Sequence, residues 1–132
     1  MSHLNTIAPT GRGNVFHPRC PSRVVLKHLT NTWGILTVLA LAPGTLRFSE
    51  IRSKVGGISE RMLAQTLKEL EADGVLVRKS YPVVPPRVEY TLTDFGLEAA
   101  RRLVALSDWI EEQIPVLLRR RADQMGPRAI PE

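Results

Sequence analysis

The residues best suited to chemistry lie on one side of a single expected helix, in the segment ISERMLAQTLKELEADG at positions 58 to 74. Its apolar stripe consists of Leu63, Leu67 and Leu70. At about 100° per residue, the opposite side carries Arg61, Gln65 and Lys68, with the small Ala64 beside them. Arginine and amide side chains can each bind a base edge through two hydrogen bonds, and lysine binds phosphates, so this face suits a DNA major groove. The alternative is a plain solvent-exposed face, because many surface helices carry these residue types.

Two short helices joined by a glycine-bearing turn are expected to position that face. The segment LRFSEIRSKVGG predicts a brief helix that Ser49 caps and that ends at Gly56 and Gly57. Ser59 is expected to cap the helix that follows, and Gly74 marks its end. Such a pair is typical of a helix-turn-helix.

After Gly74 the hydrophobic period changes from helical to two. The segments VLVRKSY and RVEYTLT alternate apolar and polar residues, so they predict two paired strands, with Val88, Tyr90 and Leu92 on one face. The connecting PVVPP contains three prolines, which cannot continue a hydrogen-bonded ladder, and it should protrude as a stiff loop. The expected fold is therefore a winged helix-turn-helix, mainly α with a small β-wing (α+β).

Helices are expected on both sides of this unit. CPSRVVLKHLT predicts a helix that begins at Pro21, and TWGILTVLALAPG predicts a helix buried in the core. Thr93 should cap a long last helix, which Pro115 should kink or stop because proline removes a backbone donor.

The last helix is expected to need a partner. Beyond Leu103 it outruns what a domain of this size can cover, so its apolar side chains would be exposed in a monomer. These side chains are Leu106, Trp109, Ile110, Ile114 and Leu117. A two-fold homodimer would bury them and present two reading faces to a pseudo-palindromic site in double-stranded DNA.

Length and composition bound the remaining choices. The 132 residues predict one domain over 19–121, with a flexible arm over 1–18 and a flexible tail over 122–132. A net charge of +5 and a pI near 10 favour phosphate backbones or anionic lipid. Since the sequence shows neither a signal peptide nor an apolar run long enough to span a bilayer, a cytoplasmic protein without a membrane partner is expected.

No spacing of residues points to catalysis, a cofactor or a metal. The three histidines, His3, His17 and His28, lack ligand spacing, and the sequence has a single cysteine. A glycine-rich phosphate loop, a nucleophile elbow and a spaced carboxylate pair are missing as well. We therefore expect no enzyme, no catalytic residue, no cofactor and no metal.

Cys20 is the one residue with expected reaction chemistry. It begins the first helix, beside Arg19 and Arg23 and near His17, and a helix N-terminus with neighbouring cations lowers the pKa of a thiol. Without an internal partner it could bond only to a second subunit or to an electrophile. The alternative is a small apolar plug between that helix and the dimer interface.

Three of these segments carry a resemblance to a known family. Taken together, RFSEI, ISERMLAQTLKELEADG and YPVVPPRVEYTLT resemble the HxlR-type winged-helix transcriptional regulators of bacteria, relatives of the MarR group. The resemblance covers about residues 20 to 118 and looks closest to a subgroup found beside quinone oxidoreductase genes. It implies a homodimeric DNA-binding regulator, most often a repressor, whose terminal helices form the dimer.

The resemblance also implies roles for individual residues. It places DNA contacts at Arg47, Ser49, Ser59, Arg61, Gln65, Lys68 and Arg87. Arg61 and Gln65 are the candidates for base readout, whereas Lys68 and Arg87 position the DNA backbone, unless Arg87, at the base of the wing, inserts along the minor groove. Some family members use a cysteine at the position of Cys20 to sense quinones, aldehydes, hypochlorite or disulfide stress, which makes Cys20 a candidate redox sensor.

Two functions from different classes stay open. The first is a dimeric DNA-binding regulator, switched by oxidation or alkylation of Cys20 or by a small ligand. The second is a winged-helix protein-interaction module without DNA readout, in which the basic face is incidental. Salt separates them, because phosphate contacts release counterions and DNA binding falls steeply as salt rises, whereas an apolar surface barely responds.

Overall fold

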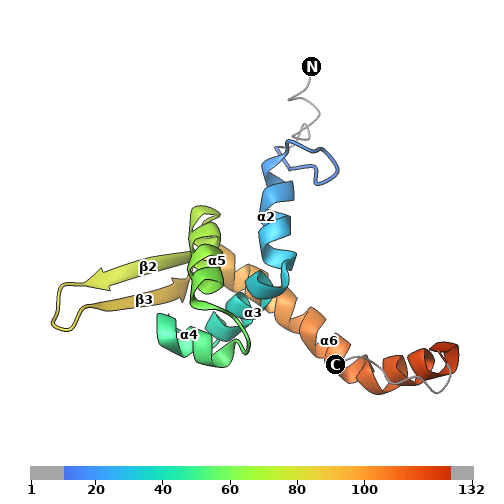
Figure 1. Cartoon of the computed structure of the whole chain (residues 1–132). Coiled ribbons are helices and arrows are strands. Elements are labelled where there is room, and N and C mark those ends of the chain that lie inside the picture. The colour runs from blue at the N-terminus through green and yellow to red at the C-terminus, as the bar shows by residue number, and fades with distance from the viewer. Residues whose placement is uncertain (1–10, 126–132) are drawn as a thin grey trace.

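The computed structural model describes residues 11–125, which form helices and one small sheet (Figure 1). In chain order the elements are α2 (Pro21–Thr30), α3 (Thr32–Leu41), β1 (Leu46–Arg47), α4 (Phe48–Lys54), α5 (Glu60–Ala72), β2 (Leu76–Tyr81), β3 (Arg87–Leu92) and α6 (Asp94–Met125). Helices α4 and α5 are the predicted helix-turn-helix, and β2 and β3 are its wing. The chain therefore has the winged helix-turn-helix fold that the sequence predicts.

The hydrophobic core lies around α3, which α2, α4, α5, β3 and α6 all contact. Its fully buried side chains include Leu41 of α3, Ile51 of α4, Leu63 and Leu70 of α5, and Leu76 of β2. Helix α3 is apolar around most of its circumference, so it can bury side chains against neighbours on most sides. Among residues 11–125 no single helix is long and apolar enough to cross a membrane; α2 and α3 reach that length and composition only as a pair, bent by 75° at their junction.

The sheet has three antiparallel strands in the order β1-β3-β2. The predicted pair runs from Leu76 opposite Leu92 to Tyr81 opposite Arg87, and Tyr90 and Leu92 face the core. The third strand, β1, was not predicted and places Leu46 opposite Tyr90. A strand of two residues is too short to show a period in the sequence, so only the pairing with β3 reveals it.

Two of the predicted helix caps are confirmed. The Met62 backbone N–H donates to Ser59 Oγ at 3.0 Å, which satisfies a free donor at the start of α5. The Gly96 N–H donates to Thr93 Oγ1, also at 3.0 Å, at the start of α6. Gly74 has φ +78° and ends α5 in the left-handed conformation that glycine favours.

The predicted cap at Ser49 is wrong. Ser49 lies inside α4, and Arg47 occupies the N-cap position. There the Arg47 backbone N–H donates to Glu50 Oε1 at 2.8 Å. A glutamate at the third helical position can reach back across the first turn, so the acidic side chain replaces the hydroxyl cap.

The two ends of the chain depart from the expected boundaries. Helix α6 does not stop at Pro115 but continues to Met125, beyond the boundary expected at residue 121. Its red end turns away from the direction of its orange part (Figure 1). Within the expected arm, the His17 N–H donates to the Asn14 carbonyl at 3.1 Å, so this part forms a hydrogen-bonded turn. The remaining arm and tail, residues 1–10 and 126–132, lie outside the described residues.

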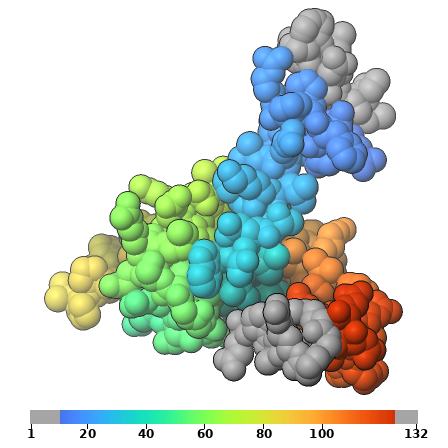
Figure 2. All heavy atoms as spheres, turned by 45° about the vertical axis from the view of Figure 1, so that its right-hand side comes forward, coloured from blue at the N-terminus to red at the C-terminus, as the bar shows by residue number. Residues whose placement is uncertain are grey.

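Helices α2 and α6 extend away from the body that holds the helix-turn-helix. Figure 2 shows α2, in blue, standing out on one side, and the end of α6, in red, on another. The wing projects in a different direction, past α5 and α4 (Figure 1). The surface around α5 and the wing is therefore separate from the surface that α2 and the end of α6 expose.

Candidate nucleic-acid interface

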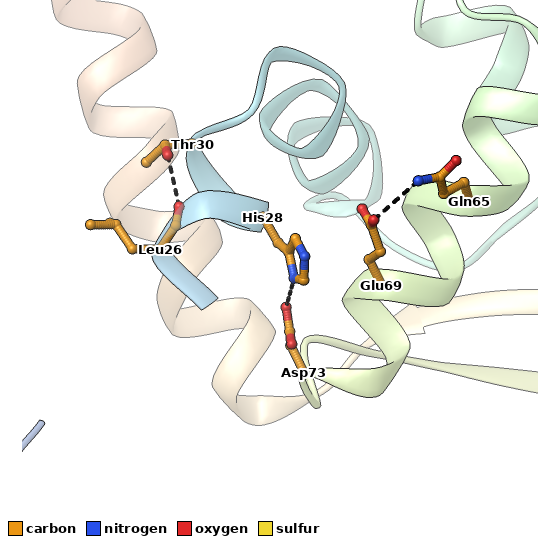
Figure 3. Close-up of polar contacts among 6 residues, drawn as sticks. All are labelled: Leu26, His28, Thr30, Gln65, Glu69 and Asp73. Carbon is orange, nitrogen blue, oxygen red and sulfur yellow. Dashed lines mark hydrogen bonds and ion pairs between the residues drawn. The ribbon is translucent and has the colours of Figure 1, made fainter. Parts of the chain in front are cut away.

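The face of α5 opposite the core is open to solvent. Its buried side is formed by Leu63, Leu67 and Leu70 together with Thr66. Its open side carries Arg61, Ala64, Gln65 and Lys68, all of which are exposed. Gln65 Nε2 donates to Glu69 Oε2 at 3.3 Å, one turn along the same helix (Figure 3). This bond is long and exposed, so it leaves the amide accessible to another partner.

A hollow of about 720 Å³ lies between the open face of α5 and the strands of the wing. Its lining residues are Arg61, Ala64, Gln65, Leu67, Lys68 and Glu71 from α5, Arg78 from β2, and Tyr90 from β3. Three cations and one carboxylate give this lining an excess of positive charge. The hollow therefore suits a phosphate-rich surface, whose counterions such cations displace.

Arg78 and Tyr90 belong to this hollow although neither is among the predicted site residues. They are directly opposite each other in the pairing of β2 with β3, and opposite residues of an antiparallel pair project from the same face. One feature of the sequence could have indicated Arg78: it lies two residues after the buried Leu76, so both side chains are on the same face of the strand. The register that brings it next to α5 is a tertiary property.

The wing carries a stacked cluster of cations around Tyr81. The Arg87 guanidinium carbon lies 4.4 Å from the centre of the Tyr81 ring, and Lys79 Nζ lies 5.2 Å from it. Arg87 Nε also lies 3.4 Å from Glu89 Oε2. Because Arg87 pairs with Tyr81 in the last pair before the loop, it lies at the outer end of the strands. Its predicted position at the base of the wing is wrong.

The other predicted DNA contacts lie outside the hollow. Arg47 and Ser49 are exposed at the first turn of α4, and Ser59 is exposed at the N-cap of α5. The Ser59 hydroxyl accepts the Met62 N–H, so it acts as an ordinary cap while still facing solvent. The N-terminal ends of α4 and α5 thus present backbone donors and hydroxyls, which are groups that bind phosphates.

Two neighbouring cations have partners inside the protein. Arg52 Nε donates to the Ile58 carbonyl at 3.2 Å, across the turn between α4 and α5. Lys54 Nζ donates to the Ala40 carbonyl of α3 at 3.1 Å. These cations hold the helix-turn-helix together, so a count of basic residues overstates the charge that is free to meet DNA.

The predicted dimer stripe on α6 is exposed in the single chain. Its members are Leu106, Trp109, Ile110, Ile114 and Leu117. Trp109 exposes 59% of its surface, a large apolar area for one side chain. A small hollow of about 150 Å³ beside this stripe is lined by residues of α3 and α6, including Leu39, Leu106 and Ile110. This surface has the apolar chemistry of a protein interface.

Comparison with known proteins identifies the family. The family model for the HxlR-like helix-turn-helix matches residues 28–117. The chain belongs to the HxlR-like helix-turn-helix family. It is 52% identical over 118 residues to the uncharacterized HTH-type transcriptional regulator YtfH of Escherichia coli (strain K12), which covers 89% of this chain and 94% of that protein.

Two solved structures of similar proteins agree in fold. The ytfH protein of Salmonella typhimurium is 55% identical, with a TM-score of 0.78 over 83% of this chain and 98% of that one. The redox regulator HypR in its reduced form is 36% identical, with a TM-score of 0.67 over 74% of this chain and 96% of that one. The chain is thus an HTH-type transcriptional regulator of the HxlR family with a DNA-binding winged helix.

The match to the HxlR family includes the whole helix-turn-helix and wing but begins after Cys20. Cys20 is the N-cap of α2, and only 1% of its surface is exposed. Its sulfur lies 3.0 Å from Ser22 Oγ, and the Asn14 backbone N–H donates to it at 3.2 Å. These hydrogen bonds, first that of Ser22 and then that of Asn14, lower the pKa of the thiol. The direction is the expected one, but hydrogen bonds rather than neighbouring cations cause it.

Proposed function

We propose that this HxlR-family regulator acts in the cytoplasm as a homodimeric, sequence-specific repressor that binds a pseudo-palindromic operator in double-stranded DNA. The observation that carries the proposal is the open face of α5, where Arg61, Gln65 and Lys68 share one hollow with Arg78 of the wing. A helix of this kind fits a major groove, and a dimer seated on a promoter blocks polymerase by occupying its site.

The residues divide by the chemistry that each offers to DNA. Arg61 and Gln65 read base edges, since each can form two hydrogen bonds with one base. The remaining residues contact the phosphate backbone and position it. They are Arg47, Ser49, Ser59, Lys68 and Arg87, together with Arg78, which lines the same hollow. The alternative role for Arg87, which is stacked at the outer end of the wing, is insertion along the neighbouring minor groove.

The dimer rests on the apolar stripe of α6. Leu106, Trp109, Ile110, Ile114 and Leu117 would be buried against a second copy, and α2 adds the half-exposed Val24 and Leu26. A two-fold axis through this surface leaves the wing and α5 free on each protomer, because they lie on a different side of the molecule (Figure 1).

The regulatory switch in this proposal is Cys20. Its lowered pKa favours the thiolate, which is the form that attacks an oxidant or an electrophile. Similarity to HypR, a redox regulator, supports the same role here. A disulfide with Cys20 of the second copy or an adduct with a small electrophile would both displace the turn that covers the thiol; a noncovalent ligand is the other route.

The test is a fluorescence-anisotropy titration with the DNA upstream of the gene that encodes this chain. Specific binding should weaken steeply with salt, with a slope of about −0.9 for each phosphate contact in a plot of log K against log salt. A flat salt dependence would instead identify a protein-interaction module. The titration is repeated with diamide for the wild type and for Cys20→Ser, which should keep DNA binding and lose the diamide response. An undiminished response in Cys20→Ser would refute the sensor.

A further inference from the structure

A side-chain hydrogen bond joins α2 to the end of the recognition helix. His28 Nδ1, in the last turn of α2, lies 2.5 Å from Asp73 Oδ2, at the C-cap of α5 (Figure 3). The side chains are only 19% and 11% exposed. The Asp73 carboxylate can only accept, so the Nδ1–H of His28 donates to it.

The position of Asp73 is unusual for an acidic residue. The C-terminal end of a helix carries partial negative charge from its free carbonyl groups, which disfavours a carboxylate there. Asp73 closes α5, where its backbone N–H donates to the Glu69 carbonyl at 3.1 Å. The hydrogen bond from His28 offsets this unfavourable interaction of the Asp73 carboxylate with the helix end. The pair therefore fits this site better than Asp73 alone would.

Helix α2 packs loosely, with Leu29 as its one apolar side chain among those that pack against the core. Not one of its ten residues, Pro21–Thr30, is fully buried. Its last turn is nevertheless held closely, because a Cβ at Gly34 would lie only 1.9 Å from the His28 carbonyl oxygen. The direction of α2 relative to α5 is therefore set in its last turn, by the backbone approach of His28 to α3, the packing of Leu29 against the core and the side-chain bond from His28 to Asp73.

We propose that the His28–Asp73 pair is a positioning link that holds each recognition helix at a fixed angle to α2, and thereby to the dimer. The inference rests on the proposed dimer, in which α2 and α6 of both copies form the contact surface. In that arrangement α2 connects the dimer interface to α5. The link then determines the separation and orientation of the two recognition helices, which the operator's half-site spacing must match.

The link predicts a selective defect in His28→Ala. Each recognition helix keeps its own fold and cap, so binding to one half-site should be unchanged. Affinity for the complete operator should fall roughly tenfold, a common size for coupling between two sites, and the preference for one half-site spacing should relax. His28→Asn, whose amide nitrogen stands near the place of Nδ1, should restore both.

Thr30→Ala is the matched control. Thr30 Oγ1 donates to the Leu26 carbonyl at 2.7 Å within α2, so the variant removes a bond from the same turn without touching α5 (Figure 3). It should keep the wild-type affinity and spacing preference. Half-site and full-operator titrations over DNA with varied spacers supply the comparison.

A measurement without DNA separates this inference from the proposed function. Spin labels are attached to the cysteine of a Glu71→Cys variant in a Cys20→Ser background. The distribution of distances between the labels on the two recognition helices should be narrow. His28→Ala should broaden this distribution, and Thr30→Ala should not. Equal distributions in all three proteins would overturn the link, as would a His28→Ala protein that loses half-site binding and full-operator binding by the same factor. Failure of the wild type to bind any DNA, with the distance change intact, would overturn the proposed function and leave the link supported.

Discussion

Arg87 stacks on Tyr81, with 4.4 Å between the guanidinium carbon and the ring centre, at the last strand pair before the loop of the wing. Lys79 approaches the same ring, so two cations share one aromatic support. The loop that follows contains Pro82, Pro85 and Pro86, which restrict its backbone. The wing therefore presents Arg87 from a stiff support rather than on a freely moving side chain.

Tyr81→Ala should weaken binding to the operator and to unrelated DNA by the same factor. The ring orders Arg87, and a cation–π contact at an exposed site is worth about 0.5–1 kcal/mol, which is roughly two- to fivefold in affinity. Tyr81→Phe keeps the ring and should bind like the wild type. Anisotropy titrations with both DNA sequences make the comparison, and a loss confined to the operator would show that Tyr81 takes part in base readout instead.

Arg61→Ala should remove operator preference while the oligomeric state persists. Two hydrogen bonds from one arginine to a base give about 1–3 kcal/mol of discrimination, so the affinity for the operator should approach that for scrambled DNA. Arg101→Ala is the control, because Arg101 is exposed on α6 and paired with Glu98. Gel filtration accompanies the titrations, and a shift of Arg61→Ala to monomer would contradict the assignment of Arg61 to the DNA face.

Trp109→Asp should split the dimer. A carboxylate at the most exposed member of the α6 stripe would be buried without a partner in the interface, and its desolvation opposes association. Asp108→Ala, one position away but on the side of the helix opposite the centre of the α6 stripe at about 100° per residue, should remain dimeric. Sedimentation velocity distinguishes the two species, and a dimeric Trp109→Asp protein would place the interface elsewhere.

Cys20 should react with iodoacetamide at a lower pH than an ordinary cysteine does. Ser22 and the Asn14 N–H stabilise the thiolate, so the thiolate fraction at neutral pH is larger than for a free thiol, whose pKa is about 8.5. Ser22→Ala removes the larger contribution and should raise the pH midpoint, whereas Ser53→Ala on α4 should not. Equal midpoints in the wild type and Ser22→Ala would mean that the thiol reacts only after its covering turn has opened.

Much of the fold was predictable because its signals are local. The leucine stripe of α5, the hydroxyl caps at Ser59 and Thr93, and the glycine at 74 each depend on residues within a few positions of one another. The incorrect prediction for the cap of α4 also depends on local signals. Two local solutions, Ser49 and the Arg47–Glu50 pair, competed within one turn, and the sequence did not decide between them.

By itself the sequence determined the winged helix, the outward face of Arg61, Gln65 and Lys68, and the exposed apolar stripe of α6, since periodicity assigns side chains to faces. Only the tertiary structure decided which elements meet. It brought Arg78 to the hollow beside α5 and joined His28 to Asp73, 45 residues away. Only in the tertiary structure do Arg52 and Lys54 donate hydrogen bonds to backbone carbonyls. The reason is physical: a period describes one element at a time, whereas register, packing angle and polar pairing arise only when separate elements bury their apolar faces against one another.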